Sequence, residues 1–359
     1  MMVLSELARV HGLFDWLARW AMAHARGSST RLFALLYVVG VIVTVFLSND
    51  ATAVVLTPAV IVVVKKAGVK NPLPHLFACA LIANAASFVL PISNPANLVL
   101  YRHGMPTLGR WLATYALPSL LAIGATFLVL RAWFASALTE PLSRSTTTPM
   151  PRSAKLVAGG LALVIATLVL ASLRGWELGL PTLVASLVTA VTGSVVMRAR
   201  PQRLLAAVSW TTLLLVAALF VLVEGGQQLG ALRHTEHALT WAKAQPLGVG
   251  ISVVGGTLAL ANNVFNNLPV GLLTGATLAA TRETGALAAA AVIGVDLGPN
   301  LAVTGSLATI LWLLALRREG LRVRFLDFAK IGAVAMPVAL VAALAGLWLG
   351  TRMLGVVSR

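Results

Sequence analysis

Stretches of apolar residues long enough to cross a lipid bilayer recur along this chain. A membrane-spanning helix needs about 20 mostly apolar residues. The stretches that approach this length, with their flanks, are 32–48, 111–134, 156–173, 211–223 and 331–349. Hydrophobic residues make up 58% of the 359 residues and charged residues only 11%, which is unlike a soluble domain. The sequence therefore predicts an all-α polytopic membrane protein, with about eight to ten helices that cross or half-cross the bilayer.

The basic residues that give the chain its net charge of +16 lie between the apolar stretches and do not form a separate domain. Lys and Arg form short clusters at 65–70, 144–155, 198–203 and 317–324, as in the loops of membrane proteins. This distribution argues against nucleic-acid binding. Residues 1–26 lack the layout of a cleavable signal and predict one amphipathic helix. We therefore expect a multi-pass protein of the bacterial inner membrane.

Two halves of the chain resemble each other. Segment 46–58 aligns with 264–274, placing Asn49 opposite Asn267 at an offset of 218 (267 less 49). The same offset pairs Glu6 with Glu224. Downstream, 91–98 aligns with 303–310 at an offset of 212, placing Asn94 opposite Ser306. Apolar segments interrupted at corresponding places in two halves are typical of a transporter's binding site.

A Ser, Thr, Pro and Arg-rich stretch separates the halves and predicts a solvated connector. The predicted organisation is a first transmembrane repeat at 1–135, a connector at 136–154 and a second repeat at 155–359. Upstream of Glu224 the second half holds more than two apolar spans, whereas five residues precede Glu6. We therefore expect the first repeat to be shortened at its N-terminus.

The first polar interruption in each half lies between two apolar runs. It reads Ser48-Asn49-Asp50-Ala51-Thr52 in the first half and Asn266-Asn267 in the second. Polar breaks persist in hydrocarbon only where they line a cavity, and the helix that follows presents its N–H groups there. An ordinary exposed turn capped by Asn and Asp is the alternative. The recurrence of the motif, without a flanking Lys or Arg, favours tips that line a site.

A second interruption follows in each half, at 91–97 and 296–306. Its Pro and Gly residues break the helix, and its Ser, Thr and Asn residues offer hydrogen-bond donors and acceptors without charge. Such groups suit a small neutral or weakly anionic oxo-solute. The predicted substrate-binding residues are Ser48, Asn49, Thr52, Ser93, Asn94, Asn97, Asn266, Asn267, Thr304, Gly305 and Ser306.

Two carboxylates adjoin these interruptions, Asp50 and Asp296. An ionisable group at membrane depth is costly and indicates an ion or proton relay, so we predict proton coupling at both. The alternatives are a helix N-cap for Asp50 and a carboxylate satisfied by backbone amides for Asp296. Glu6 and Glu224 are interpreted as structural.

The sequence contains no signature of a cofactor, a metal site or an enzyme. Four histidines, His75, His103, His234 and His237, lack metal-ligand spacing and are interpreted as interfacial. The single cysteine, Cys79, lies in an apolar run, so we expect it to be a small buried residue. We find no nucleophile with a base. There is no Walker loop, so an ATPase would have to be a separate subunit acting in trans.

Together these motifs resemble the arsenite permease (arsenical pump membrane protein) family of the ion transporter superfamily. The most specific run is 305–312, and the resemblance extends over about 4–349. It implies two inverted repeats with re-entrant hairpins and broken transmembrane helices. It also implies export of arsenite or antimonite in exchange for protons, with the residues above at the site. A proton- or sodium-coupled carrier of another small anion stays the alternative, and a homodimer stays open.

Overall fold

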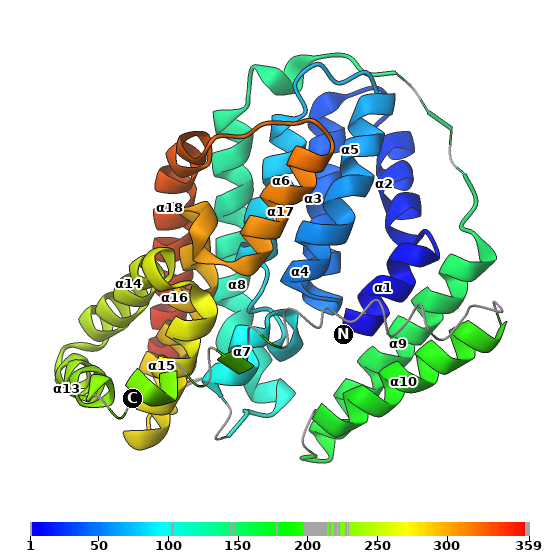
Figure 1. Ribbon diagram of the computed structural model, residues 1–359. Helices are drawn as coiled ribbons and strands as arrows, with labels where there is room; N and C mark the ends of the chain where they lie inside the picture. Colours follow the sequence, from blue (N-terminus) through cyan, green and yellow to red (C-terminus); the bar gives the residue numbers. More distant parts are fainter. Residues whose placement is uncertain are drawn as a thin grey trace.

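The computed structural model is built almost entirely of helices (Figure 1). It describes residues 2–355, except 102–103, 144, 147, 177–178, 197–213, 215–216, 219–220, 222, 227 and 229. Within this part the only β-pairing is one isolated bridge between Ser28 and Pro141.

The first half contains long helices interrupted by short ones. Its elements are α1 (Met2–Val10), α2 (Leu13–His24), α3 (Ser29–Phe46), α4 (Asn49–Ala51), the π-helix η1 (Thr52–Leu56), α5 (Thr57–Lys66), α6 (Leu73–Ala85), the 3₁₀ turn η2 (Pro91–Ser93), α7 (Pro95–Leu100) and α8 (Leu108–Trp133).

The remaining elements are η3 (Ala137–Thr139), α9 (Arg152–Leu173), α10 (Gly179–Val196), α13 (Ala231–Ala244), α14 (Leu247–Phe265), α15 (Asn267–Ala280), α16 (Ala286–Leu297), the 3₁₀ turns η4 (Gly298–Asn300) and η5 (Val303–Gly305), α17 (Leu307–Arg318) and α18 (Phe325–Leu354). Helices α9 and α10 lie side by side and pack against α1 (Figure 1).

Five helices of the described part are long and apolar enough to cross a membrane: α3, α8, α9, α14 and α18. Four shorter helices, α6, α10, α15 and α16, are also apolar. The spans predicted at 32–48, 111–134, 156–173 and 331–349 are thereby confirmed, whereas 211–223 falls largely outside the described residues. The chain is a multi-pass membrane protein.

The N-terminal segment differs from the single amphipathic helix that the sequence predicts. Gly12 adopts a φ of 72°, a left-handed conformation that glycine tolerates, and it separates α1 from α2. Leu4 and Leu7 of α1 and Phe14 of α2 are all buried. The break lets each short helix turn its own apolar face inward.

The elements of the two halves begin at corresponding positions. Helices α2, α3 and α4 begin at residues 13, 29 and 49, and α13, α14 and α15 begin at 231, 247 and 267, each 218 later (231 less 13). The second interruption keeps the other offset, since α7 begins at 95 and α17 at 307, a difference of 212. The sequence repeat is therefore a structural repeat.

The halves interlock by a reciprocal exchange of contacts. Helix α7 of the first half packs against α15 of the second, and α17 of the second packs against α4 and η1 of the first. In the first of these contacts a Cβ on Gly275 would lie only 2.7 Å from the Val99 carbonyl. Reciprocal contacts of this kind are what a two-fold relation produces. The predicted fold class, an all-α membrane protein of two repeats with hairpins and broken helices, is confirmed.

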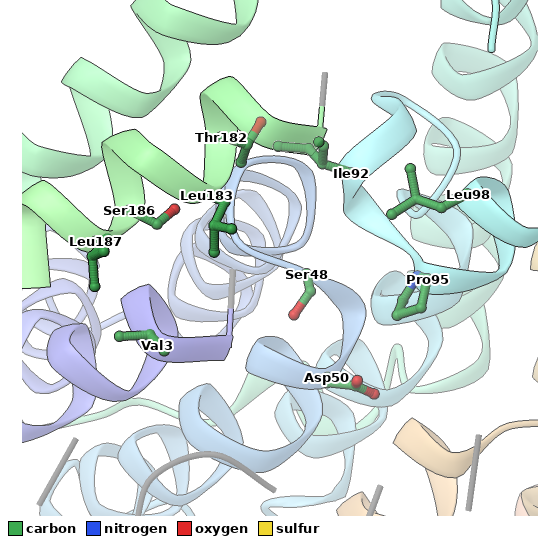
Figure 2. Close-up of a pocket in the computed structure, with 11 residues that line it drawn as sticks. Val3, Ser48, Asp50, Ile92, Pro95, Leu98, Thr182, Leu183, Ser186 and Leu187 are labelled. Carbon is green, nitrogen blue, oxygen red and sulfur yellow. The ribbon is translucent and has the colours of Figure 1, made fainter. Parts of the chain in front are cut away.

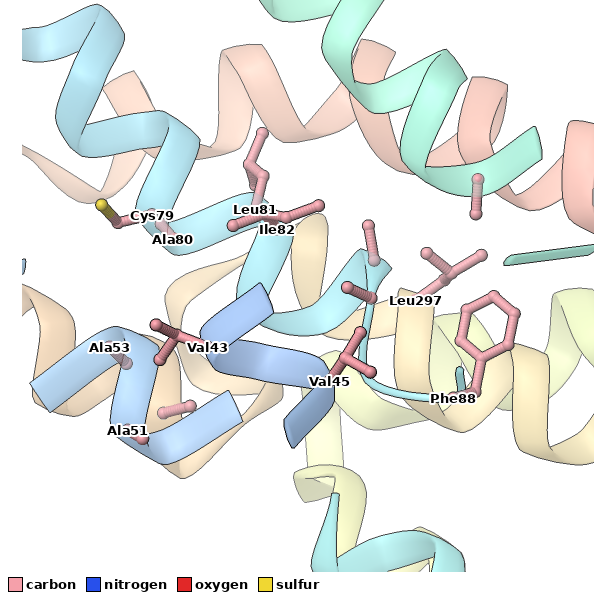
Figure 3. Close-up of a cluster of buried hydrophobic side chains, with 14 of the residues drawn as sticks. Val43, Val45, Ala51, Ala53, Cys79, Ala80, Leu81, Ile82, Phe88 and Leu297 are labelled. Carbon is pink, nitrogen blue, oxygen red and sulfur yellow. The ribbon is translucent and has the colours of Figure 1, made fainter. Parts of the chain in front are cut away.

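Small apolar side chains fill the space around the interruptions. Val43 and Val45 of α3 and Ala51 of α4 belong to one buried cluster with Ile82 of α6 and Leu297 of α16 (Figure 3). Cys79 lies in the same cluster and is buried, as the sequence predicts. The polar interruptions of the first half are largely buried by this packing, whereas Thr304 in the second half is exposed.

Candidate functional site

The first hairpin consists of α3 and of the continuous run α4, η1 and α5. Its tip, at 47–52, is closed by its own polar side chains. Ser48 Oγ accepts a hydrogen bond from the Ala51 N–H at 3.2 Å, and Asn49 Oδ1 accepts from the Asp50 N–H at 2.9 Å. The hydroxyls of Thr44 and Thr52 lie 2.8 Å apart and join the two arms. The π-helical turn that follows is a feature often found at functional sites.

The second interruption of the first half is tied to the end of that hairpin. Ser93 Oγ donates to the Val45 carbonyl at 2.8 Å. Asn94 caps α7, because its Oδ1 accepts from the Ala96 N–H at 3.1 Å. Asn97 Nδ2 donates to the Ser87 carbonyl at 2.9 Å. All three predicted residues of this break are buried.

Asp296 lies fully buried at the end of α16, and its partners come from the other half of the chain. Asn94 Nδ2 donates to Asp296 Oδ1 at 2.8 Å. Ser87 Oγ lies 2.6 Å from Asp296 Oδ2. Asn97 also interacts with this carboxyl group. The alternative of a carboxylate satisfied by backbone amides is therefore wrong, since side chains surround it.

The second hairpin consists of α14 and α15. Its tip, at Asn266, is bonded to the second interruption of the same half. Asn266, at a positive φ of 70°, donates through Nδ2 to the Thr304 carbonyl at 3.1 Å. Thr304 Oγ1 donates to the Asn263 carbonyl at 2.9 Å, and Asn263 Oδ1 accepts from the Ala302 N–H at 3.0 Å. Asn267 is buried at the start of α15. These bonds tie the tip of the second hairpin to the turn at 302–304.

A second buried network surrounds Asn84, at the end of α6. Its Nδ2 donates to Asn300 Oδ1 at 2.9 Å, and Asn300 Nδ2 donates to the Leu81 carbonyl at 3.0 Å. Ser306 Oγ lies 3.5 Å from Asn84 Oδ1 and 2.9 Å from Thr309 Oγ1. Ser306 also caps α17 by accepting from the Thr309 N–H. These bonds join α6 to the second interruption of the opposite half.

The Asn84 and Asp296 networks occupy equivalent places in the two halves. Their residue numbers differ by 212 (296 less 84), and the same offset relates Asn94 to Ser306 and Asn97 to Thr309. Asp296 contacts Asn94 across the halves, and Asn84 contacts Ser306 in return. One position carries a carboxyl group and its equivalent carries an amide, so the site is symmetric in shape but not in charge.

A cavity of about 360 Å³ opens beside the first tip (Figure 2). Ser48 and Asp50 lie on one side of it, and Thr182 and Ser186 of α10 lie on the other. Its apolar lining consists of Val3, Ile92, Pro95, Leu98, Leu183 and Leu187, with Gly179 completing the wall. No Lys, Arg or His is among the described residues that line it.

The predicted site residues thus do not form one cluster, and Asn49, Thr52 and Ser93 lie neither at the cavity nor in the two buried networks. Ser48 and Asp50 face the cavity, whereas Asn94, Asn97, Asp296 and Ser306 belong to the buried networks between the halves. The second-half predictions Asn266, Asn267, Thr304, Gly305 and Ser306 do not line the cavity. Their role in binding, like that of the whole predicted set, stays a prediction.

Several polar residues of these places were not predicted. Asn84, Ser87, Asn300 and Thr309 lie in the networks, and Thr182 and Ser186 lie at the cavity. Continuing the offset of 212 upstream from Asn94 and Ser306 would have paired Asn84 with Asp296. Helix α10 belongs to no detected repeat motif, so its two hydroxyl residues gave no signal.

The interfacial interpretation of His75 is wrong. This side chain is fully buried in the first turn of α6, edge-on to the ring of Phe33 with 6.2 Å between ring centroids. Neighbouring aromatic packing covers it although it lies near a helix end. His234 and His237 are exposed on α13, and His103 lies outside the described residues.

Comparison with known families decides the class of protein. The family model described as "Citrate transporter" matches residues 1–296. The chain belongs to the citrate transporter family. It is therefore a transporter of the membrane, as the sequence predicted.

Relatives of this citrate transporter family member include arsenical pump membrane proteins. That of Yersinia enterocolitica is 27% identical over 361 residues, covering 95% of this chain and 82% of the relative. That of Escherichia coli is 25% identical, with the same coverage of each chain. The predicted resemblance to the arsenical pump membrane proteins of the ion transporter superfamily is confirmed.

A solved structure shares the fold. The chain matches the Alcanivorax borkumensis YdaH transporter, whose topology is described as unusual, with a TM-score of 0.52. The match covers 98% of this chain and 84% of that transporter at 18% sequence identity. It supports the architecture of this family member.

Proposed function

We propose that the protein is an antiporter of the bacterial inner membrane that exports arsenite or antimonite in exchange for protons. In this antiporter the predicted substrate-binding residues bind the solute, and the carboxyl groups of Asp50 and Asp296 bind the protons. Its partners are then the solute, the coupling ion and the surrounding lipid. A homodimer and an ATPase subunit in trans are further partners that the sequence leaves open.

The main support for this proposal is the burial of Asp296 among neutral hydrogen-bonding side chains. This carboxyl group is fully buried between the two halves, and it is held by the neutral side chains of Ser87 and Asn94. No Lys, Arg or His of the described residues hydrogen-bonds to it. A buried carboxyl without a cation is expected to exchange a proton as part of its function.

The lining of the cavity is suited to a small solute that carries no fixed charge. Its polar lining consists of hydroxyls and the Asp50 carboxyl, and it lacks a basic residue among the described lining residues. Arsenite in its neutral hydroxide form can hydrogen-bond to such groups. A tricarboxylate such as citrate would need cationic partners, because buried anions are stable only when paired. The relatives named arsenical pump membrane proteins support the same choice.

One observation favours a sodium-coupled carrier as the second candidate. The Asn97 side chain interacts with Asp296, and its buried Oδ1 accepts no hydrogen bond from the described residues. A free oxygen acceptor beside a carboxyl group could coordinate a hard cation, since such cations prefer oxygen ligands.

Uptake into everted membrane vesicles tests the solute. Vesicles that contain the protein are expected to accumulate arsenite and antimonite when energised, and labelled citrate to stay at the level of vesicles without the protein. Citrate accumulation in the absence of arsenite uptake would contradict the proposed solute.

We predict that Asn49→Ala and Asn267→Ala each reduce arsenite transport while the protein stays folded. Each variant removes one amide that we assign to the site, a loss of roughly 0.5 to 1.5 kcal/mol for a neutral hydrogen bond. The matched control is Asn71→Ala, because Asn71 Oδ1 accepts from the Leu73 N–H in a turn away from both tips. Initial rates in vesicles, normalised to protein, measure the effect. Unchanged transport rates in both tip variants would show that the tips are ordinary turns and do not bind the solute.

We predict that Cys79→Ala retains arsenite transport. One buried thiol in an apolar cluster cannot supply the several thiolates that bind arsenic tightly. Transport rates and the size-exclusion profile of the variant check this expectation. If a well-folded Cys79→Ala protein no longer transports arsenite, recognition by oxygen and nitrogen groups would be contradicted. A thiol relay would then be favoured.

A further inference from the structure

Ser87 lies where the two halves meet, in the turn between α6 and η2. Its side chain is fully buried. Its Oγ lies 2.7 Å from the Asn84 carbonyl oxygen and 2.6 Å from Asp296 Oδ2. One hydroxyl therefore touches the end of α6 from the first half and the carboxyl group of the second half.

A count of protons limits how these contacts are made. The Asn84 carbonyl can only accept, and an ionised carboxylate can only accept, but Ser87 has a single hydroxyl proton. When Asp296 is ionised, Ser87 satisfies it by turning its proton away from the Asn84 carbonyl. When Asp296 carries a proton on Oδ2, that proton is donated to Ser87 Oγ, and Ser87 donates to the Asn84 carbonyl. Both short contacts are hydrogen bonds only in the protonated state.

The neighbouring amides cannot take over this role. Asn94 Oδ1 is occupied by the Ala96 N–H, so Asn94 Nδ2 must face Asp296. Asn97 Nδ2 donates to the Ser87 carbonyl, which fixes that amide as well. Their orientations follow from fixed backbone partners. The Ser87 hydroxyl is thus the rotatable donor of the network.

We propose that Ser87 is a positioning residue that transmits the protonation state of Asp296 to the end of α6. In the protonated state the Ser87 hydroxyl adds a hydrogen bond to the Asn84 carbonyl, and in the ionised state it withdraws that bond. Because the Asn84 side chain contacts Asn300 and Ser306, the change reaches the equivalent network of the other half. This inference rests on the proposed proton site at Asp296.

The repeat shows that the relay is one-sided. The residue equivalent to Ser87 at the offset of 212 is Pro299, which has no hydroxyl (299 less 87). The position equivalent to Asp296 holds the neutral Asn84. The carboxyl group and its hydroxyl partner therefore occur together once, at one of two otherwise equivalent places.

Other ionisable groups around α16 do not hydrogen-bond to Asp296 or Ser87 within the described residues. Tyr115 of α8 interacts electrostatically with Asp296, and its hydroxyl lies 3.0 Å from that of Tyr101, after α7. Helices α14 and α15 carry no ionisable side chain. The ionisable residues of the other packed helices are His75 and Cys79 on α6 and Asp327, Lys330 and Arg352 on α18.

Infrared difference spectroscopy of the full chain in liposomes tests the relay without any solute. A carboxylic acid and a carboxylate absorb at different frequencies, so a pH titration follows Asp296 directly, and the Asp296→Asn variant identifies its band. Ser87→Ala is expected to move the midpoint of that band upward by roughly one to two pH units, because the carboxylate loses a donor. Ser87→Thr keeps a hydroxyl and is expected to restore the wild-type midpoint.

The matched control is Ser119→Ala. Ser119 is a buried serine of α8 whose Oγ has no hydrogen-bond partner among the described residues, so the Asp296 band of this variant should have the wild-type midpoint. Equal midpoints for Ser87→Ala and wild type, in proteins with wild-type size-exclusion profiles, would overturn the relay. So would the absence of any band that depends on Asp296. The protein could also show a band that depends on both Asp296 and Ser87 and yet fail to transport arsenite in vesicles. That result would support the relay and contradict only the proposed solute.

Discussion

Asp296→Asn is expected to abolish proton-driven accumulation of arsenite while its equilibration down a gradient persists. Asn has nearly the shape of Asp and keeps a neutral hydrogen-bonding group toward Asn94 and Ser87. It cannot load or release a proton. Everted vesicles with an imposed proton gradient measure accumulation, and counterflow without a gradient measures equilibration.

Asp50→Asn tests the other carboxyl group in the same vesicles. Asp50 faces the cavity beside the first tip and not the network between the halves. We expect the loss of accumulation to be larger for Asp296→Asn. Wild-type accumulation by both variants would show that neither carboxyl couples protons, and sodium would then be the ion to examine.

Gly294→Ala is expected to destabilise the protein strongly. A Cβ at Gly294 would lie 3.0 Å from the carbonyl carbon of Gly255, so α14 and α16 cross with their backbones in contact. Backbone atoms cannot move aside as a flexible side chain can. Overpacking of this kind costs about 1 to 3 kcal/mol, and here it falls on the helix that carries Asp296. Thermal unfolding in detergent measures the loss.

The matched control for this substitution is Gly256→Ala on the facing helix. A Cβ there would meet no heavy atom of the described residues within 4 Å. Since glycine inside a helix is less stable than alanine by about 0.5 to 1 kcal/mol, this variant should unfold at the wild-type temperature or above it. A lower unfolding temperature for Gly256→Ala than for Gly294→Ala would contradict the close crossing of α14 and α16.

The membrane class and the repeat could be predicted because both depend on local patterns. Apolar length identified α3, α8, α9 and α18, and the shared Asn49 and Asn267 motif gave the register that the helices follow. The break at Gly12 was missed because one amphipathic period describes both α1 and α2, while only packing shows that each turns inward separately.

The site was harder to predict because its contacts cross between the halves. Asn94 and Asp296 were recognised as polar residues at helix breaks, but their direct hydrogen bond depends on how the halves interlock. Asn84 lies at the end of an otherwise apolar helix and Ser87 in the turn that follows, where a polar residue resembles a cap. Their importance comes from the opposite half, which no local pattern contains.

Proton movement driven by arsenite efflux shows directly whether the protein exchanges arsenite for protons. Purified protein in liposomes that enclose a pH-sensitive dye is given an outward arsenite gradient, with no imposed voltage and no sodium. If the protein exchanges arsenite for protons at Asp296, proton entry starts with arsenite efflux and is absent in Asp296→Asn. Arsenite efflux without proton entry in the wild type, or equal proton entry in Asp296→Asn, would contradict this exchange.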